Sequence, residues 1–313
     1  MQRSKPGNRF RQILQTFPSP VRKYLETIPQ SGGMLAAEHR RAVKAILKIS
    51  EDDLMLRLLP MAKGYGAAAI SDFQVGAVAK VRMSGNTGEI ALFLGANIEF
   101  AAQALTQTIH AEQAAVVNAW LQGARQIDTI AVSAAPCGYC RQFLCELEGR
   151  HMLSVILQKP DSGKVTKYNV SDLLPRAFGP RQLGSKSGLM ASAAQPADLN
   201  LQSPSNDAFV LEALAAADKS YAPYSQNYAG VSIKTVDGRI YAGRYAENAA
   251  FNPSLSPLHT AIVSMNMDSL ETDRKISKAV LVEKPTSISQ RAVCELILQT
   301  VAPDVRLEYY EAK

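Results

Sequence analysis

The sequence predicts an α/β protein in which a three-layer α/β/α sandwich occurs twice, after a small N-terminal helical region. Strand-like and helix-like patterns alternate between about residues 73 and 158, an order that builds a sheet with helices on both faces. The same order restarts after about residue 206. The chain has 313 residues, of which 47% are apolar, and this suits roughly two domains with cores of their own.

The first predicted elements are helical. Residues 8–30 mix apolar and basic positions and predict one or two short helices. Apolar residues recur at helical spacing over 34–49 and predict a longer helix. Ser50 is followed by three acidic residues, a pattern typical of a helix N-cap. A further helix is therefore expected over 54–62.

The first sandwich is predicted from the order β-β-α-β-α-β. Its strands are expected at 73–82, 90–94, 127–133 and 153–158, with a hairpin turn at 84–88 and helices at 108–121 and 137–147. Residues 159–205 are rich in proline and glycine, which indicates a long connection. Within it, residues 173–180 resemble an ordered turn.

The second sandwich is predicted from the same kinds of pattern. Its helices are expected at 208–219, 259–265 and 288–300, and its strands at 230–234, 239–243, 278–283 and 305–309.

The charge and hydropathy of the chain bear on its partners. The net charge is +6 and the pI is near 9.1. The basic residues are scattered without a run of five like charges, so charge does not favour a nucleic-acid partner. No segment approaches the ~18 uncharged apolar residues of a membrane helix, and no membrane partner is expected.

The chemistry is concentrated between His110 and Cys140, where the chain reads His110-Ala111-Glu112 and then Pro136-Cys137-Gly-Tyr-Cys140. Zinc binds imidazole nitrogen and thiolate sulfur, and three protein ligands leave a fourth tetrahedral position for water. The spacing matches the signature of zinc-dependent nucleobase deaminases. We therefore expect His110, Cys137 and Cys140 to bind one Zn²⁺ per chain, with Glu112 as a general acid/base and not a ligand.

The spacing also predicts where these residues stand on their helices. Two residues within a helix are about 200° apart, so His110 and Glu112 can serve one site only at a helix entrance. Cys137 and Cys140 follow Pro136 and suit a first helical turn. Zinc lowers the pKa of bound water from about 15.7 towards about 7. The expected reaction is attack of zinc-bound hydroxide on C4, with Glu112 carrying the proton to N3 and to the leaving amine.

A structural zinc site is the competing interpretation, and it would need a fourth protein ligand. Cys145 is the nearest candidate, but it lies roughly 140° around the helix from Cys140 and is expected in the core. His39, His151 and His259 are interpreted as structural or surface residues. An intact Glu112 favours the catalytic interpretation.

The N-terminus and the cysteines bear on location. Basic residues at 3, 5, 9, 11, 22 and 23 precede the first acid, Glu26, as in an organellar presequence. Pro18 and Pro20 interrupt an amphipathic helix there, which favours a basic extension instead. Metal-binding thiolates need a reducing compartment, so we expect a cytoplasmic protein and leave an organellar address open.

A hand alignment of the two halves predicts that the second copy has lost the metal. It pairs Ala96-Asn97 with Glu247-Asn248, Phe100 with Phe251, His110 with His259, Pro136 with Pro285 and Cys145 with Cys294. Glu112, Cys137 and Cys140 then fall on Ala261, Thr286 and Ser289. One histidine and two hydroxyls do not make a zinc site. The predicted organisation is an N-terminal helical region (1–52), a catalytic zinc domain (53–158), an ordered linker (159–205) and a non-catalytic repeat (206–313).

Several motifs resemble the two-domain, homodimeric, bacterial-type cytidine deaminases. They are Ser71-Asp72-Phe73-Gln-Val-Gly-Ala-Val, Gly95-Ala-Asn97-Ile-Glu99-Phe100, Gln107-Thr-Ile-His110-Ala111-Glu112-Gln113, Pro136-Cys137-Gly-Tyr-Cys140-Arg-Gln-Phe143, Leu173-Leu-Pro175 through Gly179-Pro180, and Tyr245-Ala-Glu-Asn-Ala-Ala-Phe251-Asn-Pro253. Together they span nearly the whole chain from about residue 50.

The resemblance implies a cytidine-deaminase-like fold and a role in pyrimidine salvage. It implies hydrolytic deamination of cytidine and 2′-deoxycytidine to uridine and 2′-deoxyuridine in a homodimer. Asn97 and Glu99 would bind the ribose 3′-hydroxyl, Phe73 would stack on the base and the Ala111 backbone would hold it. Phe251 of the partner subunit would close the pocket. By themselves, Phe73 would be a core strand aromatic and Asn97 a turn residue.

Two other functions compete with this one. A nucleic-acid-editing cytosine or adenine deaminase would share the zinc motif, but a carboxylate at Glu99 would repel phosphate, and no stripe of aromatic and basic residues is evident. A non-catalytic protein stabilised by zinc would not need Glu112.

Overall fold

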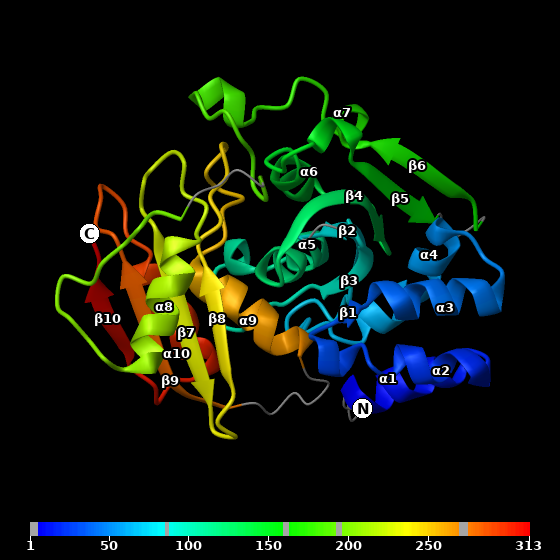
Figure 1. The fold of residues 1–313 in the computed structure, drawn as a ribbon, viewed down its shortest axis with the longest axis horizontal. Coiled ribbons are helices and arrows are strands. Elements are labelled where there is room, and N and C mark those ends of the chain that lie inside the picture. Colours follow the sequence, from blue (N-terminus) through cyan, green and yellow to red (C-terminus); the bar gives the residue numbers. More distant parts are fainter. Residues whose placement is uncertain (1–5, 85–87, 159–162, 192–195, 269–274) are drawn as a thin grey trace. The chain divides into compact units, whose positions relative to one another are not determined.

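The computed structural model describes residues 6–84, 88–158, 163–191, 196–268 and 275–313. The chain divides into two compact units. The N-terminal unit comprises Met1–Glu99, Ile109–Ala177 and Asn266–Thr272, and the C-terminal unit comprises Phe100–Thr108, Phe178–Met265 and Asp273–Lys313. Each unit contains one mixed sheet and its helices (Figure 1).

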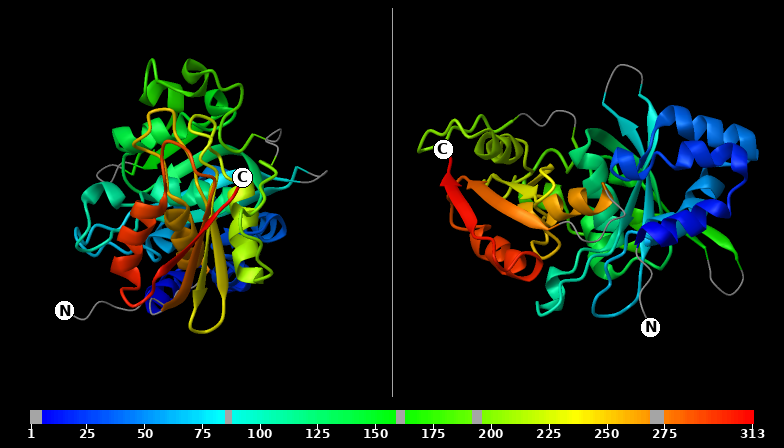
Figure 2. Two further views of the ribbon diagram at one scale, coloured as in Figure 1. Left: turned by 90° about the vertical axis from the view of Figure 1, so that its left-hand side faces the viewer. Right: turned by 90° about the horizontal axis from the view of Figure 1, so that it is seen from below.

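The N-terminal unit opens with short helices that pack side by side, α1 (Pro6–Gln15), α2 (Ser19–Leu25) and α3 (Ala37–Leu47) (Figures 1 and 2). The prediction of one or two short helices over residues 8–30 is confirmed, with two formed. The helix predicted from residue 34 is wrong at its start. Met34 and Leu35 form the short strand β1, which pairs antiparallel with Phe93 and Leu92. A sheet partner distant in sequence therefore decides the conformation of these two residues.

Helix α4 (Glu51–Lys63) begins where the sequence predicts. The Ser50 Oγ accepts a hydrogen bond from the Asp53 N–H at 3.1 Å, and the Asp53 carboxylate accepts one from the Ser50 N–H at 3.3 Å. This reciprocal capping satisfies two backbone donors that the helix start leaves unpaired. The helix then buries Leu54 and Leu58 completely.

The sheet of the N-terminal unit contains six strands in the order β1-β3-β2-β4-β5-β6. Its remaining members are β2 (Gly76–Met83), β3 (Ile90–Ala96), β4 (Ala124–Val132), β5 (Ser154–Gln158) and β6 (Val165–Asn169). The pair β4 and β5 is parallel, and the other pairs are antiparallel. Part of the predicted hairpin turn, residues 85–87, lies outside the described residues.

The sequence missed β6 and the short helix α7 (Val170–Leu173), which lie in the predicted connection over 159–205. Strand β6 reads Val-Thr-Lys-Tyr-Asn and has no fully buried residue. It is an edge strand that pairs with β5. Because an edge strand of this kind buries little, it carries no apolar alternation that a sequence pattern could detect.

Two glycines show that helices cover both faces of this sheet. A Cβ added at Gly76 would lie 2.7 Å from the Lys63 backbone nitrogen in α4, and one added at Gly95 would lie 2.1 Å from the Ala115 nitrogen in α5 (Ala111–Leu121). Gly95 is paired with Ala77, the neighbour of Gly76, so the two glycines face opposite sides of the sheet. The helices α4 and α5 therefore form the outer layers.

The C-terminal unit repeats this arrangement with four strands in the order β10-β9-β7-β8. Its elements are α8 (Ala208–Asp218), β7 (Ala229–Thr235), β8 (Ile240–Arg244), α9 (Pro257–Met267), β9 (Ile276–Glu283), α10 (Arg291–Val301) and β10 (Leu307–Glu311). Gly230 meets the backbone of α8 and Gly243 meets that of α9, as Gly76 and Gly95 meet α4 and α5. The predicted duplicated three-layer α/β/α fold is confirmed.

The strand pairings correct the predicted alignment of the two copies. Ile98 bridges Ala67 and Ile109, and Ala246 bridges Tyr221 and Leu255 in the same way. Glu99 is therefore the counterpart of Glu247, and the predicted pairing of Asn97 with Asn248 is wrong.

The same register corrects the predicted match of His110 with His259. Gly95 packs against Ala111 and Ala115, and Gly243 packs against Pro257 and Ala261. Ser256 consequently stands at the position of His110, Leu258 at that of Glu112, and His259 at that of Gln113. The histidine that the sequence alignment pairs with His110 therefore lies three residues beyond the equivalent position. The predicted pairing of Glu112 with Ala261 is wrong for the same reason.

None of the helices in the described part of the chain has the length and apolar character needed to cross a bilayer.

Candidate active site

Three potential metal ligands converge in the N-terminal unit. The ligand atoms of His110, Cys137 and Cys140 all lie within 4.8 Å of one another. Cys137 Sγ is 3.6 Å from His110 Nδ1 and 3.7 Å from Cys140 Sγ. A nitrogen and two sulfurs at this spacing are the donor set that zinc prefers, with one tetrahedral position left for water or substrate. The residues present therefore fit a zinc ion.

Two helix N-termini bring these ligands together, as the residue spacing predicted. His110 is the N-cap of α5, with extended backbone, and its N–H donates to Gln113 Oε1 at 3.0 Å. Cys137 is the N-cap of α6 (Gly138–Leu144), and Cys140 lies in the first turn of that helix. Helix N-termini favour negative charge, so both thiols stand where thiolates are stabilised.

Arg141 stabilises the start of α6 through two hydrogen bonds to backbone carbonyls. Its Nε donates to the Pro136 carbonyl at 2.9 Å and its Nη1 donates to the Leu173 carbonyl at 3.2 Å. The residue before Cys137 is thereby tied to the end of α7. Arg141 and Gln113 both lie within the family-like motifs, but the motifs alone predicted no role for them. For Gln113 a signal was present, because a glutamine three residues after an N-cap is typical of reciprocal capping.

The electrostatics of the cluster fit a site that needs a cation. Hydrogen bonds from Cys140 and His110 lower the pKa of Cys137 to about 3. The hydrogen bond with Cys137, together with burial, raises the pKa of Cys140, and the contact with Cys137 raises that of His110. One of two adjacent thiols ionises readily and the second does not, because two thiolates repel each other. A bound divalent cation removes that conflict.

Glu112 lies beside the cluster and is almost completely buried, with 4% of its surface exposed. Burial raises the pKa of its carboxyl group, and a hydrogen bond with Cys140 acts in the opposite direction. A carboxyl group whose pKa is raised by burial is suited to take up and release a proton as a general acid/base.

The end of β3 is tied to the segment that precedes β2. Asn97 Oδ1 accepts from the Val75 N–H at 2.8 Å, and Asn97 Nδ2 donates to the Phe73 carbonyl at 3.0 Å. The Glu99 carboxylate accepts from the Ile70 N–H at 2.7 Å and from the Ser71 N–H at 2.9 Å. Both side chains are thus fixed against one loop.

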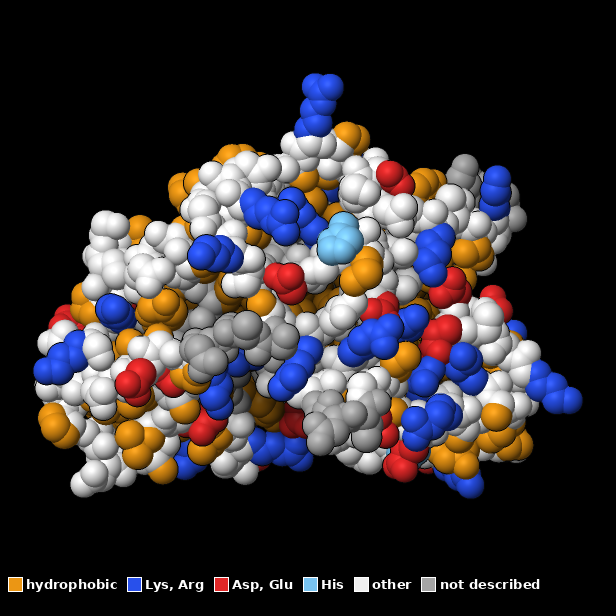
Figure 3. Space-filling view, turned by 45° about the horizontal axis from the view of Figure 1, so that its top comes forward, with side chains coloured by type: hydrophobic (Ala, Val, Ile, Leu, Met, Phe, Trp, Pro, Cys, Tyr) orange, Lys and Arg blue, Asp and Glu red, His pale blue; other side chains and the backbone are white. Residues whose placement is uncertain are grey.

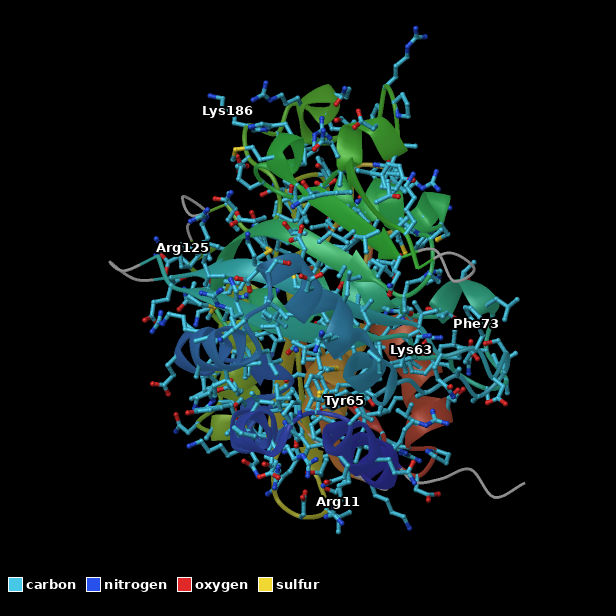
Figure 4. All side chains as sticks on the ribbon, turned by 90° about the vertical axis from the view of Figure 1, so that its right-hand side faces the viewer. Arg11, Lys63, Tyr65, Phe73, Arg125 and Lys186 are labelled. Atoms are coloured by element: carbon cyan, nitrogen blue, oxygen red, sulfur yellow. The ribbon has the colours of Figure 1, made fainter. Side chains whose placement is uncertain are left out.

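The residue type and pattern of Phe73 alone indicated a core aromatic residue on a strand, and the structure shows that this interpretation is wrong. It precedes β2 and 63% of its surface is exposed, at the periphery of the molecule (Figure 4). Ala111 is the first residue of α5 and is buried. Phe251 belongs to the C-terminal unit, where it is also 63% exposed and has a left-handed backbone (φ 62°).

The other cysteines and histidines considered as ligands lie outside the cluster of three. Cys145 is buried, and burial raises the pKa of its thiol. His39 contacts the Thr27 hydroxyl and the Tyr24 ring. His151 is exposed, and His259 is buried in the C-terminal unit.

Lys and Arg side chains are dispersed among acidic and apolar ones on the face in Figure 3, without a continuous basic stripe.

Comparisons with known proteins agree with the site. Residues 49–155 and residues 170–295 each match a family described as the cytidine and deoxycytidylate deaminase zinc-binding region. A cytidine deaminase of Aliivibrio fischeri is 40% identical over 304 residues, covering 96% of this chain and 97% of that protein. One of Photorhabdus laumondii is 40% identical over 308 residues, covering 96% and 98%. One of Sodalis glossinidius is 44% identical over 261 residues, covering 80% and 81%.

The two tandem matches to this family agree with the duplicated sheet, and the one ligand cluster found among the described residues lies in the first match. The chain belongs to the cytidine deaminase family.

Proposed function

We propose that this protein is a zinc-dependent hydrolase that converts cytidine and 2′-deoxycytidine to uridine and 2′-deoxyuridine with release of ammonia, as in pyrimidine salvage. The observation that carries the proposal is the buried Glu112 carboxyl group beside the cluster of His110, Cys137 and Cys140. Family membership supports the same reaction.

In the proposed mechanism the ligand residues bind the metal and Glu112 transfers the protons. His110, Cys137 and Cys140 hold one zinc ion, which supplies Lewis-acid chemistry and lowers the pKa of water from about 15.7 towards about 7. Glu112 accepts one proton from water and delivers it to N3 of the pyrimidine. It then accepts the second proton of the same water oxygen, now bonded to C4, and delivers it to the amine, which leaves as ammonia. The raised pKa of this carboxyl group favours proton uptake, as the role of proton carrier requires, and its burial limits access of bulk water.

The nucleoside is proposed to lie between the cluster and the loop before β2. Phe73 presents an exposed ring on which a base can stack. The carboxylate of the half-buried Glu99 accepts hydrogen bonds from substrate hydroxyls, assisted by Asn97. The Ala111 backbone at the start of α5 holds the base. Contacts to the 3′-hydroxyl do not sense the 2′ position, so both nucleosides are expected as substrates.

A second copy of the chain is proposed to complete the pocket through Phe251. This large apolar side chain is exposed, yet its backbone is held in a turn. The Phe251 N–H donates to the Asn248 carbonyl at 2.8 Å, and the Phe251 carbonyl accepts from the Ser254 N–H at 2.9 Å. An exposed aromatic ring on a fixed turn suits an interface. We therefore infer a homodimer, and a cytoplasmic location in which the ligand thiols stay reduced.

An ultraviolet assay of the zinc-loaded protein tests the proposal. Cytidine and 2′-deoxycytidine should lose their amino group, cytosine should react far more slowly, and a chelator should abolish turnover until zinc is restored. A protein that binds one zinc per chain and leaves both nucleosides unchanged would refute the proposed activity.

A further inference from the structure

The turn that precedes Phe73 contains a hydroxyl group in contact with two parts of the proposed substrate site. The Ser71 Oγ–H donates to Glu99 Oε1, and the same oxygen accepts from the Phe73 N–H at 3.1 Å. A serine hydroxyl has one donor and two acceptor positions, so it can make both bonds at once. Ser71 therefore connects the carboxylate proposed to bind the sugar with the ring proposed to stack on the base.

The bonds around Ser71 fix the orientation of the Glu99 carboxylate. Oε2 accepts from the Ile70 and Ser71 N–H groups, at 2.7 and 2.9 Å, and Oε1 accepts from the Ser71 hydroxyl. With internal donors on both oxygens, rotation of the carboxylate would break a bond. Because each oxygen can accept more than one hydrogen bond, Glu99 keeps the capacity to accept from a substrate hydroxyl.

The second copy contains the same turn without the aromatic ring. Glu247 Oε2 accepts from the Tyr224 N–H at 2.8 Å and from the Ser225 N–H at 3.2 Å, and Ser225 Oγ accepts from the Asn227 N–H at 3.2 Å. The residue after each serine has a left-handed backbone, with φ of 56° at Asp72 and 57° at Gln226. The backbone of the turn and its N–H bonds to the glutamate are thus shared, and the residue that follows differs, Phe73 in one copy and Asn227 in the other. The bond from the serine hydroxyl to the carboxylate is found at Ser71.

We propose that Ser71 is a positioning residue for the nucleoside, acting through Glu99 and Phe73, so that sugar and base are recognised by one preorganised unit. This inference rests on the proposed function. Groups held in advance by packing and hydrogen bonds lose less entropy when substrate binds. Phe73 is largely exposed, so the bond from its backbone to Ser71 is one of the contacts that can restrain it.

The test measures Ser71→Ala in the zinc-loaded full chain with two substrates, cytidine and 3′-deoxycytidine. With cytidine, Ser71→Ala should raise KM about tenfold with a smaller change in kcat, the size expected for a hydrogen bond to a charged acceptor. With 3′-deoxycytidine, which lacks the hydroxyl assigned to Glu99, the same substitution should change kcat/KM less than about threefold. Ser71→Thr keeps the hydroxyl and should restore cytidine KM to within about threefold of the wild type.

Ser225→Ala is the matched control, because it removes the equivalent hydroxyl from the second copy. It should leave the KM for cytidine unchanged. Equal losses on the two substrates, or an equal loss in Ser225→Ala, would show that Ser71 acts only on folding and would overturn the inference. If the wild type is active and Ser71→Ala has the same KM for cytidine, the inference is overturned and the proposed function stands. If the zinc-loaded wild type leaves cytidine unchanged, the proposed function is overturned as well.

Discussion

The two copies use one framework and fill its centre with different chemistry. In the N-terminal unit the His110 N–H donates to Gln113 at the start of α5, and in the C-terminal unit the Ser256 N–H donates to His259 Nδ1 at 3.3 Å at the start of α9. Both copies cap the helix from the residue before its first turn, but the imidazole proposed to bind metal stands at this position only in the first copy, where the second has Ser256. A framework can therefore keep its geometry after its chemistry is lost.

A hydrogen-bond network stands in the C-terminal unit where the N-terminal unit has its ligand cysteines. Glu283 is fully buried and accepts from Asn227 Nδ2 at 2.7 Å, from the Gln290 N–H at 2.9 Å and from the Ser289 Oγ–H at 3.0 Å. Asn227 follows the shared turn at the position of Phe73, and the strand register places Ser289 at that of Cys140. These four residues form the Glu283 network. Its paired polar groups fill the region that corresponds to the proposed substrate and metal site of the first copy.

The largest expected effect separates the proton carrier from the metal ligands. Glu112→Gln should retain one zinc per chain and lower kcat for cytidine about a thousandfold, because the amide cannot carry the proton. Zinc is measured by elemental analysis and turnover by ultraviolet absorbance. Leu258 at the equivalent position of the second copy predicts that no second proton carrier compensates. Retention of both zinc and turnover would remove Glu112 from the mechanism.

The next effect compares the equivalent carboxylates Glu99 and Glu247. Glu99→Ala should raise the KM for cytidine about a hundredfold, because a substrate hydroxyl and three internal donors lose a charged acceptor. Glu247→Ala removes the matching group from the second copy and should leave KM unchanged in the folded fraction. Steady-state kinetics with cytidine and cytosine measure both, and an equal effect of Glu99→Ala on the two substrates would exclude a role in binding ribose.

A smaller effect concerns the stability of the second copy. Glu283→Gln should lower the free energy of unfolding by about 2 kcal/mol, because the new amide places a buried donor among existing donors. Chemical denaturation at fixed zinc concentration measures it. Glu295→Gln is the control, since this half-exposed carboxylate pairs with Arg291 on a helix surface and its loss should change stability by less than about 0.5 kcal/mol. Loss of zinc from the Glu283 variant would contradict the expectation that this network stabilises the second copy without affecting zinc binding in the first.

The smallest expected effect is a dependence of stability on pH that arises from His259 in the second copy, where the first copy has Gln113. Burial lowers the pKa of His259 from 6.5 to about 4. Between these values the unfolded chain binds the proton and the folded chain does not, so His259 weakens the fold as pH falls from about 6.5 towards about 4 and adds no such loss above 6.5. Lowering the pH from 7 to 5.5 should cost about 1 kcal/mol of stability through this group.

The variant His259→Gln installs the residue that stands at the equivalent position, Gln113, and should remove this part of the pH dependence. Unfolding free energies of both proteins at several pH values between 5 and 7.5 provide the measurement. Parallel pH profiles for the two proteins would show that His259 does not titrate on unfolding.

Much of the candidate site was predictable because its signals are local. The spacing of His110 and Glu112, and of Cys137 and Cys140, predicts two helix entrances, and both helices begin there. The Ser50 cap is likewise encoded within four residues. The roles assigned to the individual site residues stay predictions.

The sequence by itself determined the ligand chemistry, the helix starts and the duplication, since residue types and short spacings express them. Tertiary structure decided the register of the second copy, because strand bridges and the packing of two glycines against their helices make Leu258, and not Ala261, the counterpart of Glu112. It also placed β1 and β6, whose conformations depend on a neighbouring strand, and joined Ser71 to Glu99 across 28 residues. Contacts between residues distant along the chain leave no periodic pattern, and they decide how the proposed substrate site is held.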